Sequence, residues 1–299
     1  MSYQSEQPQT STQSGLKVGN VLPSFVEQVP ASSLYVSISE LIMEKVFFHP
    51  GFAAAESELD QVEKEAIQAL LGEQNVEQFF VTTLVDAITS SITPEHTTIC
   101  VELNDATSYE MSALLGGKVE VDEVNPQLGL RGVSRFSSES YQACFALECE
   151  VIKALRAEGH NIEIVVPCVR ALSDAAKIID RLAERGLPRG LNGLKVLYAC
   201  DTPSAVLLSE RLLHYFDGLV LKLESLTQLT LGVDLMHEEL AHLYDPQNEA
   251  VLALVKQALA ACHQVNKPAS IVVDNLSDLP QLVELLQDEN KVTVFPVSE

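Results

Sequence analysis

The sequence has 299 residues, of which 46% are hydrophobic and 20% charged, so it is long enough to bury one large core or two modest ones. Its 42 acidic and 19 basic residues give a formal net charge of -23. This shortage of Lys and Arg argues against nucleic acid and anionic membranes as partners, because phosphate contacts need clustered basic side chains. No apolar run approaches the ~20 residues of a membrane span and no secretory leader pattern is present, so we expect a cytoplasmic protein without a membrane span.

The first 20 residues, MSYQSEQPQTSTQSGLKVGN, are rich in Ser, Thr and Gln and have no apolar periodicity. This composition predicts a disordered polar tail over residues 1–20. We expect residues 21–299 to form a single domain.

Short apolar runs from residue 33 onward predict eight β-strands. They are 33–41, 97–104, 129–136, 161–169, 194–202, 217–224, 269–275 and 291–297. Apolar residues at three- and four-residue spacing, as in 137–160, 173–186 and 249–265, predict amphipathic helices between the strands. A further helical block, 55–72 followed by 76–92, is predicted between the first two strands.

Strands that are apolar on both faces and alternate with helices predict a parallel sheet covered by helices. Eight such units favour a closed (β/α)8 or TIM barrel of the α/β class over an open sheet. In such a barrel the helical block 55–92 would be an insertion after the first strand, and no helix would follow the last strand. The outer face of that strand would then need cover from residues 21–29, VLPSFVEQV, or from another chain.

The six cysteines never form C-x-x-C, and the seven histidines show no H-x-x-x-H spacing. The cysteines are Cys100, Cys144, Cys149, Cys168, Cys200 and Cys262. Most lie among apolar residues, which predicts buried free thiols in a reducing compartment and no structural zinc site.

Six co-linear segments carry a family resemblance. They are NPQLGLRGVSRF (125–136), CFALECEVIKALR (144–156), VVPCVRALSDA (165–175), GLPRGLNGLKV (186–196), DTPSAVLLSERLLHYFDG (201–218) and LTQLTLGVD (226–234). Together they resemble the C-terminal phosphoenolpyruvate (PEP)/pyruvate-binding barrel of PEP synthase, in the pyruvate phosphate dikinase superfamily. The resemblance covers about residues 34–298.

The resemblance implies a magnesium-dependent reaction at the carboxyl ends of the strands. A phosphohistidine on a separate domain gives its phosphoryl group to the enolate of pyruvate. This chemistry needs arginines around the phosphoryl group, two carboxylates on the metal and an acid for the methyl carbon. The nucleotide-binding and phosphohistidine domains lie outside the resemblance, which implies at most half of a two-part enzyme.

Several family site positions are changed in this sequence. The arginines of the first and second strands fall at Ile38 and Glu102, and the asparagine–aspartate pair of the metal site falls at Glu224 and Ser225. The proton-donating cysteine falls at Val272. Ile38 cannot donate to phosphate, Val272 has no proton to give, and Glu102 replaces attraction with repulsion of ~4 kcal/mol at about 4 Å and an effective dielectric of 20.

Other positions are kept. Arg131, Arg170, Asp105 and Asp274 are expected remnants of the ligand site, and the first metal-binding glutamate becomes Asp201. We therefore predict a degenerate site with no catalytic residues and no required cofactor. Mg²⁺ would need Asp201 together with Glu224, whose side chain is one residue off along the strand.

Three functions remain open. The first is a non-catalytic paralogue acting as a scaffold, regulatory or self-assembling subunit. It would form homo-oligomers, extended to rings or filaments through a bare last strand. In LTQLTLGVD we then expect Thr227 and Gln228 to hold the loop and helix.

The second function is an enzyme or sensor for a small oxoacid such as pyruvate or PEP. Asp201, Glu224, Asp274 and Arg131 would line its site, with Mg²⁺ optional. The third is the barrel half of a split phosphotransferase, whose partner is a phosphohistidine-domain protein or a full-length PEP synthase.

Overall fold

A closed parallel barrel forms the centre of the molecule. The computed structural model describes residues 16–24, 29–287, 289 and 291–298. Its strands follow the order β1-β9-β8-β7-β6-β5-β4-β3-β2, and every pair is parallel. The strands are β1 (Lys17–Val18), β2 (Asn20–Leu22), β3 (Ser33–Ser37), β4 (Thr98–Glu102), β5 (Ile162–Val166), β6 (Lys195–Cys200), β7 (Leu219–Lys222), β8 (Ala269–Val273) and β9 (Val292–Pro296).

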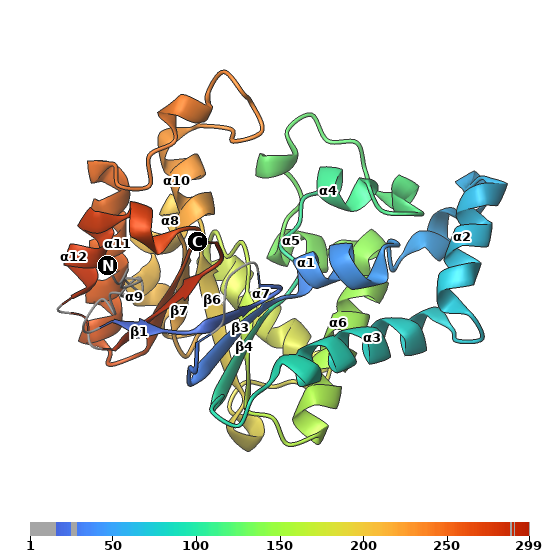
Figure 1. Cartoon of the computed structure of the whole chain (residues 1–299), viewed down its shortest axis with the longest axis horizontal. Helices are drawn as coiled ribbons and strands as arrows, with labels where there is room; N and C mark the ends of the chain where they lie inside the picture. The colour runs from blue at the N-terminus through green and yellow to red at the C-terminus, as the bar shows by residue number, and fades with distance from the viewer. Residues whose placement is uncertain (1–15, 25–28, 288, 290, 299) are drawn as a thin grey trace, which may run out of the picture.

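One extended N-terminal segment closes the cylinder. Its first half, β1, pairs with β9, and its second half, β2, pairs with β3. Between them the Gly19 amide donates to the Val294 carbonyl at 2.8 Å. Figure 1 shows this blue segment running from the red C-terminal strands to β3. The two halves therefore act as one strand, which makes eight strands in the barrel.

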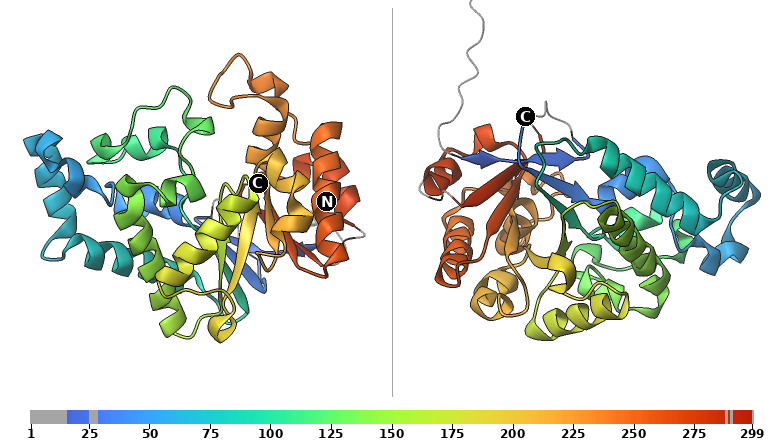
Figure 2. Two further views of the ribbon diagram at one scale, coloured as in Figure 1. Left: turned by 180° about the vertical axis from the view of Figure 1, so that it is seen from behind. Right: turned by 90° about the horizontal axis from the view of Figure 1, so that it is seen from below.

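Helices cover the outside of the barrel, as Figure 2 shows from two further directions. They are α1 (Ile38–Leu41), α2 (Gln61–Leu71), α3 (Val76–Ser91), α4 (Ser108–Ser112), α5 (Val133–Phe136), α6 (Gln142–Ala157), α7 (Leu172–Glu184), α8 (Pro203–Leu207), α9 (Ser209–Leu212), α10 (Leu223–Leu231), α11 (Glu249–Gln264) and α12 (Pro280–Leu286). A π-helical turn, Ile42–Val46, extends α1. The predicted helical block appears as α2 and α3, each opened by a capping box, at Asp60 and Asn75.

Two apolar layers result from the alternation of side chains along the strands. The smaller layer fills the barrel interior: Val21, Tyr35, Cys100, Val165, Leu197, Ala199, Val220, Val272 and Phe295. The larger layer lies between the strands and the helices. All six cysteines are buried free thiols, as predicted. Within the described part of the chain, no helix combines the length and apolarity that a membrane crossing requires.

One predicted strand was wrong and one strand was not predicted, so the number of strands was right. Residues 129–136 form a loop and α5, because Val133 and Phe136 are three residues apart and both point into the core. Gly132 there has φ +48°, and a Cβ at this position would clash with the Pro167 carbonyl. The eighth strand instead comes from residues 17–22, partly inside the predicted tail. The rest of that tail, residues 1–15, lies outside the described residues.

The outer face of β9 was expected to need cover from residues 21–29 or from another chain. Val292 and Val294 on this face are 2% and 0% exposed and belong to the larger core, as do Leu282 and Leu286 of α12. The described face is therefore buried within this chain. The predicted assembly of filaments through an uncovered last strand therefore has no support from this face.

Gly19 gives a test of the barrel closure. A Cβ here would overlap the ring of Phe295, which is fully buried in the barrel interior. We expect Gly19→Ala to lower the free energy of unfolding by about 1–3 kcal/mol, because overpacking a closed core has costs of this size. Urea unfolding followed by circular dichroism measures the change. Lys17→Ala, on the exposed part of the same segment, is the matched control, and equal stability of the two variants would contradict the closure.

Candidate functional site

A cavity of about 500 Å³ opens at the carboxyl ends of the strands, among α1, α4 and α10. Residues 103–136 and 232–248 rise on either side of it (Figure 1). Enzymes with this fold place their active sites at this end of the barrel. We call this cavity the mouth and take it as the candidate site.

Charged side chains dominate the lining of the mouth. Five are carboxylates, from Glu40, Asp105, Glu110, Glu224 and Asp274, and two are cations, from Arg131 and Lys222. The apolar wall includes Met43, Tyr109, Val272 and Val297. The mouth is therefore acidic, in keeping with the charge of the whole chain.

A buried ion pair crosses the barrel just below the mouth. The Lys222 Nζ lies 2.6 Å from Glu102 Oε2 and 3.3 Å from Asp105 Oδ2. It also lies 5.5 Å from the centre of the Tyr35 ring. Lys222 ends β7 and Glu102 ends β4, so the pair links two strands that are not neighbours in the sheet. The ammonium is fully engaged with protein groups.

Burial sets the protonation of Glu102. The side chain is 1% exposed, and its Oε1 has no hydrogen-bond partner. Desolvation raises the pKa of Glu102 to about 7, against the lowering effect of Lys222. The sequence predicted that Glu102 reverses the charge expected at this position. It did not predict Lys222, although a lysine within the apolar run 217–224 was a signal that could have revealed it.

Asp105 and Arg131 lie together at the mouth, as expected of ligand-site remnants. Ser39 Oγ donates to Asp105 Oδ1 at 2.5 Å. Burial would raise the pKa of Asp105, but Lys222, Arg131 and Ser39 together hold it below its ordinary value. Arg131 donates through Nε and Nη2 to the Asp105 carbonyl, and through Nη1 to Gln127 Oε1 at 3.0 Å. Its guanidinium therefore holds the loop after β4.

Three carboxylates at the rim are not neutralised in this way. Glu40 and Asp274 have no hydrogen bond or ion pair to their carboxylates within the described part of the chain, and Glu224 accepts only a 3.5 Å contact from Gln228. Burial raises the pKa of each, and for Glu224 the charge of Asp274 raises it further. The rim thus carries uncompensated negative charge.

Six predicted site residues line the mouth: Asp105, Arg131, Glu224, Ser225, Val272 and Asp274. The other four, Ile38, Glu102, Arg170 and Asp201, are outside its described lining. Ile38 is fully buried in the outer core, so the rim position on this element belongs to Glu40. Arg170 braces the loop that precedes α5, donating to Ser134 Oγ at 3.2 Å and to the Gly129 carbonyl at 3.2 Å.

The two predicted metal ligands differ in their surroundings. Asp201 is buried, and its Oδ2 accepts from the Cys168 amide at 2.7 Å, whereas Glu224 is exposed at the rim. Asp201 is outside the described lining of the mouth. Within residues 16–24, 29–287, 289 and 291–298, no three His, Cys, Asp or Glu side chains are grouped so that they could hold a metal ion.

A second polar network fixes the segment that carries Asp105. Glu148 accepts from the Asn104 amide at 2.9 Å and from the Tyr141 hydroxyl at 3.0 Å, and Asn104 Nδ2 donates to that hydroxyl at 2.7 Å. Burial raises the pKa of Glu148 to about 7. The sequence did not predict this group, because Asn104 ends a predicted strand whereas Tyr141 and Glu148 lie in a helical pattern about 40 residues later.

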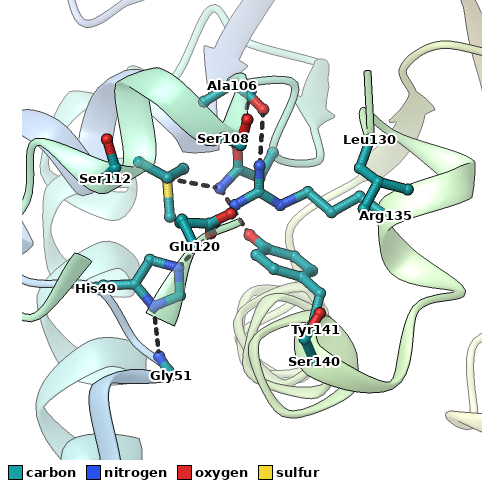
Figure 3. A network of polar contacts seen from close by, with 12 residues as sticks. His49, Gly51, Ala106, Ser108, Ser112, Glu120, Leu130, Arg135, Ser140 and Tyr141 are labelled. Carbon is teal, nitrogen blue, oxygen red and sulfur yellow. Dashed lines mark hydrogen bonds and ion pairs between the residues drawn. The ribbon is translucent and has the colours of Figure 1, made fainter. Parts of the chain in front are cut away.

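The network continues outward to His49, as Figure 3 shows. Arg135 lies over the Tyr141 ring with Cζ 4.4 Å from its centre and donates to the Ala106 carbonyl at 3.2 Å. It also pairs with Glu120, whose Oε1 lies 2.6 Å from His49 Nε2. These contacts fix the backbone on both sides of Asp105, at Asn104 and at Ala106, and so position one wall of the mouth.

Comparison with known proteins confirms the resemblance. The family model described as "PEP-utilising enzyme, PEP-binding domain" matches residues 62–289. The phosphoenolpyruvate synthase of Pseudomonas aeruginosa is 38% identical over 287 residues, which cover 92% of this chain and 36% of that protein. The phosphoenolpyruvate synthase of Escherichia coli is 37% identical over 235 residues, 77% of this chain and 29% of that protein. The chain thus spans only a minor part of these relatives.

Among solved structures, the HpcH/HpaI aldolase from Desulfitobacterium hafniense is similar with a TM-score of 0.43 and 8% sequence identity. The match covers 95% of this chain and 87% of that one.

The buried ion pair gives a testable prediction. We expect Lys222→Met to lower the free energy of unfolding by about 3 kcal/mol or more, because it leaves the buried Glu102 without its cation. The loss should be larger at about pH 8 than at about pH 5.5, where Glu102 takes up a proton and needs no partner. Urea unfolding at the two pH values measures both effects.

Two variants serve as controls for this prediction. The double variant Lys222→Met/Glu102→Gln should regain part of the lost stability. Lys153→Met breaks an ion pair with Glu150 in which the two side chains are 37% and 42% exposed, so it should cost only about 0–1 kcal/mol. A Lys222→Met variant as stable as Lys153→Met would contradict the assignment.

Proposed function

We propose, on the premise that this chain belongs to the PEP-binding domain family of the PEP-utilising enzymes, that it is a catalytically inactive member. It acts through binding, as a regulatory or scaffold subunit that assembles with copies of itself. The carrying observation is the Lys222–Glu102 ion pair, which occupies the centre of the barrel where a phosphoryl group would need free donors.

The rest of the mouth supports this proposal. Arg131, the second cation of the lining, donates from all three of its nitrogens to the Asp105 carbonyl and to Gln127, so its guanidinium is directed at the chain. Five carboxylates surround the space, and they would repel the charges of a phosphate ester. Val272 lines the mouth with a side chain that has no ionisable proton. A reducing, cytoplasmic setting is part of the proposal and is supported by the six free thiols.

The second candidate is an enzyme or sensor for a small oxoacid, with Arg131 binding the carboxylate and Mg²⁺ optional. Its support is that Arg131 does line the mouth. A third candidate, half of a split phosphotransferase, draws on the greater length of the relatives named phosphoenolpyruvate synthase.

Proton exchange on pyruvate distinguishes these candidates in an assay that needs only this barrel. An active barrel would exchange the methyl protons of pyruvate with D2O, which proton NMR follows directly, and would bind PEP in a calorimetric titration with Mg²⁺. We expect no exchange above the rate in buffer and no binding heat, because both cations of the described lining are directed at groups of this chain and Val272 supplies no acid.

A phosphoenolpyruvate synthase under the same conditions is the positive control. Exchange or PEP binding that disappears in Arg131→Ala would establish the second candidate and refute the proposal. Exchange that appears only after adding a phosphohistidine-domain protein would establish the third.

Self-assembly has its own test. Apolar side chains on the segment 103–136 are exposed, including Val124 at 106% and Leu128 at 66%. We expect the sedimentation coefficient to rise between about 1 and 100 µM protein, as mass action requires of an associating chain. Val124→Asp/Leu128→Asp should suppress the rise, whereas Val62→Asp, at a site 74% exposed on α2, should not. A monomer across the whole range would refute self-assembly.

A further inference from the structure

Negative charge at the mouth exceeds what the surrounding chain neutralises. Lys222 is shared between Glu102 and Asp105, and Arg131 is directed at a backbone carbonyl and Gln127. Glu110 accepts from the amide and hydroxyl of Thr107. The carboxylates of Glu40, Glu224 and Asp274 have no cation bonded to them in the described ranges. Each comes from a different element, so they surround the space from several sides.

Buried acceptors beneath the mouth lack donors as well. Glu102 Oε1 and Asp201 Oδ1 are buried and have no hydrogen-bond partner. Glu102 lies two residues after Cys100 on β4, and Asp201 lies two residues after Ala199 on β6. Because Cys100 and Ala199 fill the barrel interior, the alternation of strand side chains directs both carboxylates into that interior at its mouth end. Native proteins rarely leave such groups unsatisfied, so these oxygens point to a missing donor.

The arrangement does not suit a metal ion. A divalent cation needs several oxygen ligands converging at 2.0–2.6 Å. Among the described residues, no three His, Cys, Asp or Glu side chains converge in this way. An organic cation that carries separate charged groups along its length fits carboxylates that surround a space of about 500 Å³.

The remaining wall of the mouth is apolar. Met43, Val272 and Val297 lie between the carboxylates, and Tyr109 stands at the edge with 66% of its surface exposed. An aliphatic chain could cover these side chains while its charged ends reach the acids, and an aromatic face attracts an ammonium group.

We propose that the mouth binds a small aliphatic cation with two or more ammonium groups. The amines would lie between the rim carboxylates of Glu40, Glu224 and Asp274, and the methylene chain would lie against Met43 and Val272. This inference rests on the proposed function, since it supplies the ligand through which an inactive barrel could act by binding. It gives the inactive barrel a defined ligand.

Calorimetric titration of the intact chain with spermidine and putrescine tests the proposal. We expect saturable binding that is tighter for spermidine, which has more charges. Raising the ionic strength from about 0.02 to about 0.2 M should weaken it markedly, because rim charges are screened. The triple variant Glu40→Gln/Glu224→Gln/Asp274→Asn should lose about tenfold or more in affinity, as expected when complementary charges are removed.

A matched control separates local from global charge. Glu73→Gln/Glu184→Gln/Glu210→Gln removes the same number of charges from exposed positions on the outer surface, and it should bind spermidine like the native chain. Thermal unfolding with and without spermidine shows whether each variant is folded and whether the ligand stabilises it. The single variant Asp274→Asn, at an exposed site, keeps the test valid if the triple variant is unstable.

The outcomes distinguish the inference from the proposed function. No binding of either amine, or equal loss in the rim and control variants, overturns the inference and leaves the inactive barrel standing. Saturable binding of Mg²⁺ alone, without amine binding, overturns it in favour of a metal site. Amine binding that requires the rim supports it, even if PEP also binds, and in that case only the proposed function fails.

Discussion

A parallel sheet closes into a cylinder only if its first and last strands find a common neighbour, and one short segment provides it here. Residues 17–22 divide their pairing between β9 and β3, and the change of partner occurs at Gly19, where the Phe295 ring leaves no room for a side chain. Closure pairs β9 and β3, which would otherwise be the two edges of the described sheet. It also brings the ends of β4 and β7 to opposite sides of one small space, which is the condition for an ion pair across the interior.

That ion pair changes what the mouth is able to hold. In a barrel whose centre offers free donors, an anion can replace water at little cost; here Lys222 already satisfies two carboxylates, and burial keeps the pKa of Glu102 near 7. Arg131 and Arg170, which match arginines of the family pattern, both donate to loop carbonyls. Their contacts hold the loops around the mouth. Thr227 and Gln228 behave as expected from the sequence, bonding to the Leu223 carbonyl and the Leu235 amide.

The sequence was informative where periodicity and burial agree. Seven strands and the long helices follow from apolar patterns, and the family follows from co-linear motifs. The pattern failed at residues 129–136, where apolar spacing suits either a strand or a short helix and Gly132 decides for the helix. It failed again at residues 17–22, whose strand exists only because two distant strands flank it. The Lys222–Glu102 contact joins residues 120 positions apart, and the Asn104–Glu148 contact joins residues 44 positions apart. No local pattern encodes such contacts.

The Lys222–Glu102 contact also restricts how this sequence can change. Replacing either residue alone leaves the other charge buried without compensation, whereas replacing both together avoids the intermediate. A single replacement at either position therefore impairs folding before a second replacement can compensate for it. Natural selection would remove most chains that lost one charge alone, so we expect the two residues to change together during evolution.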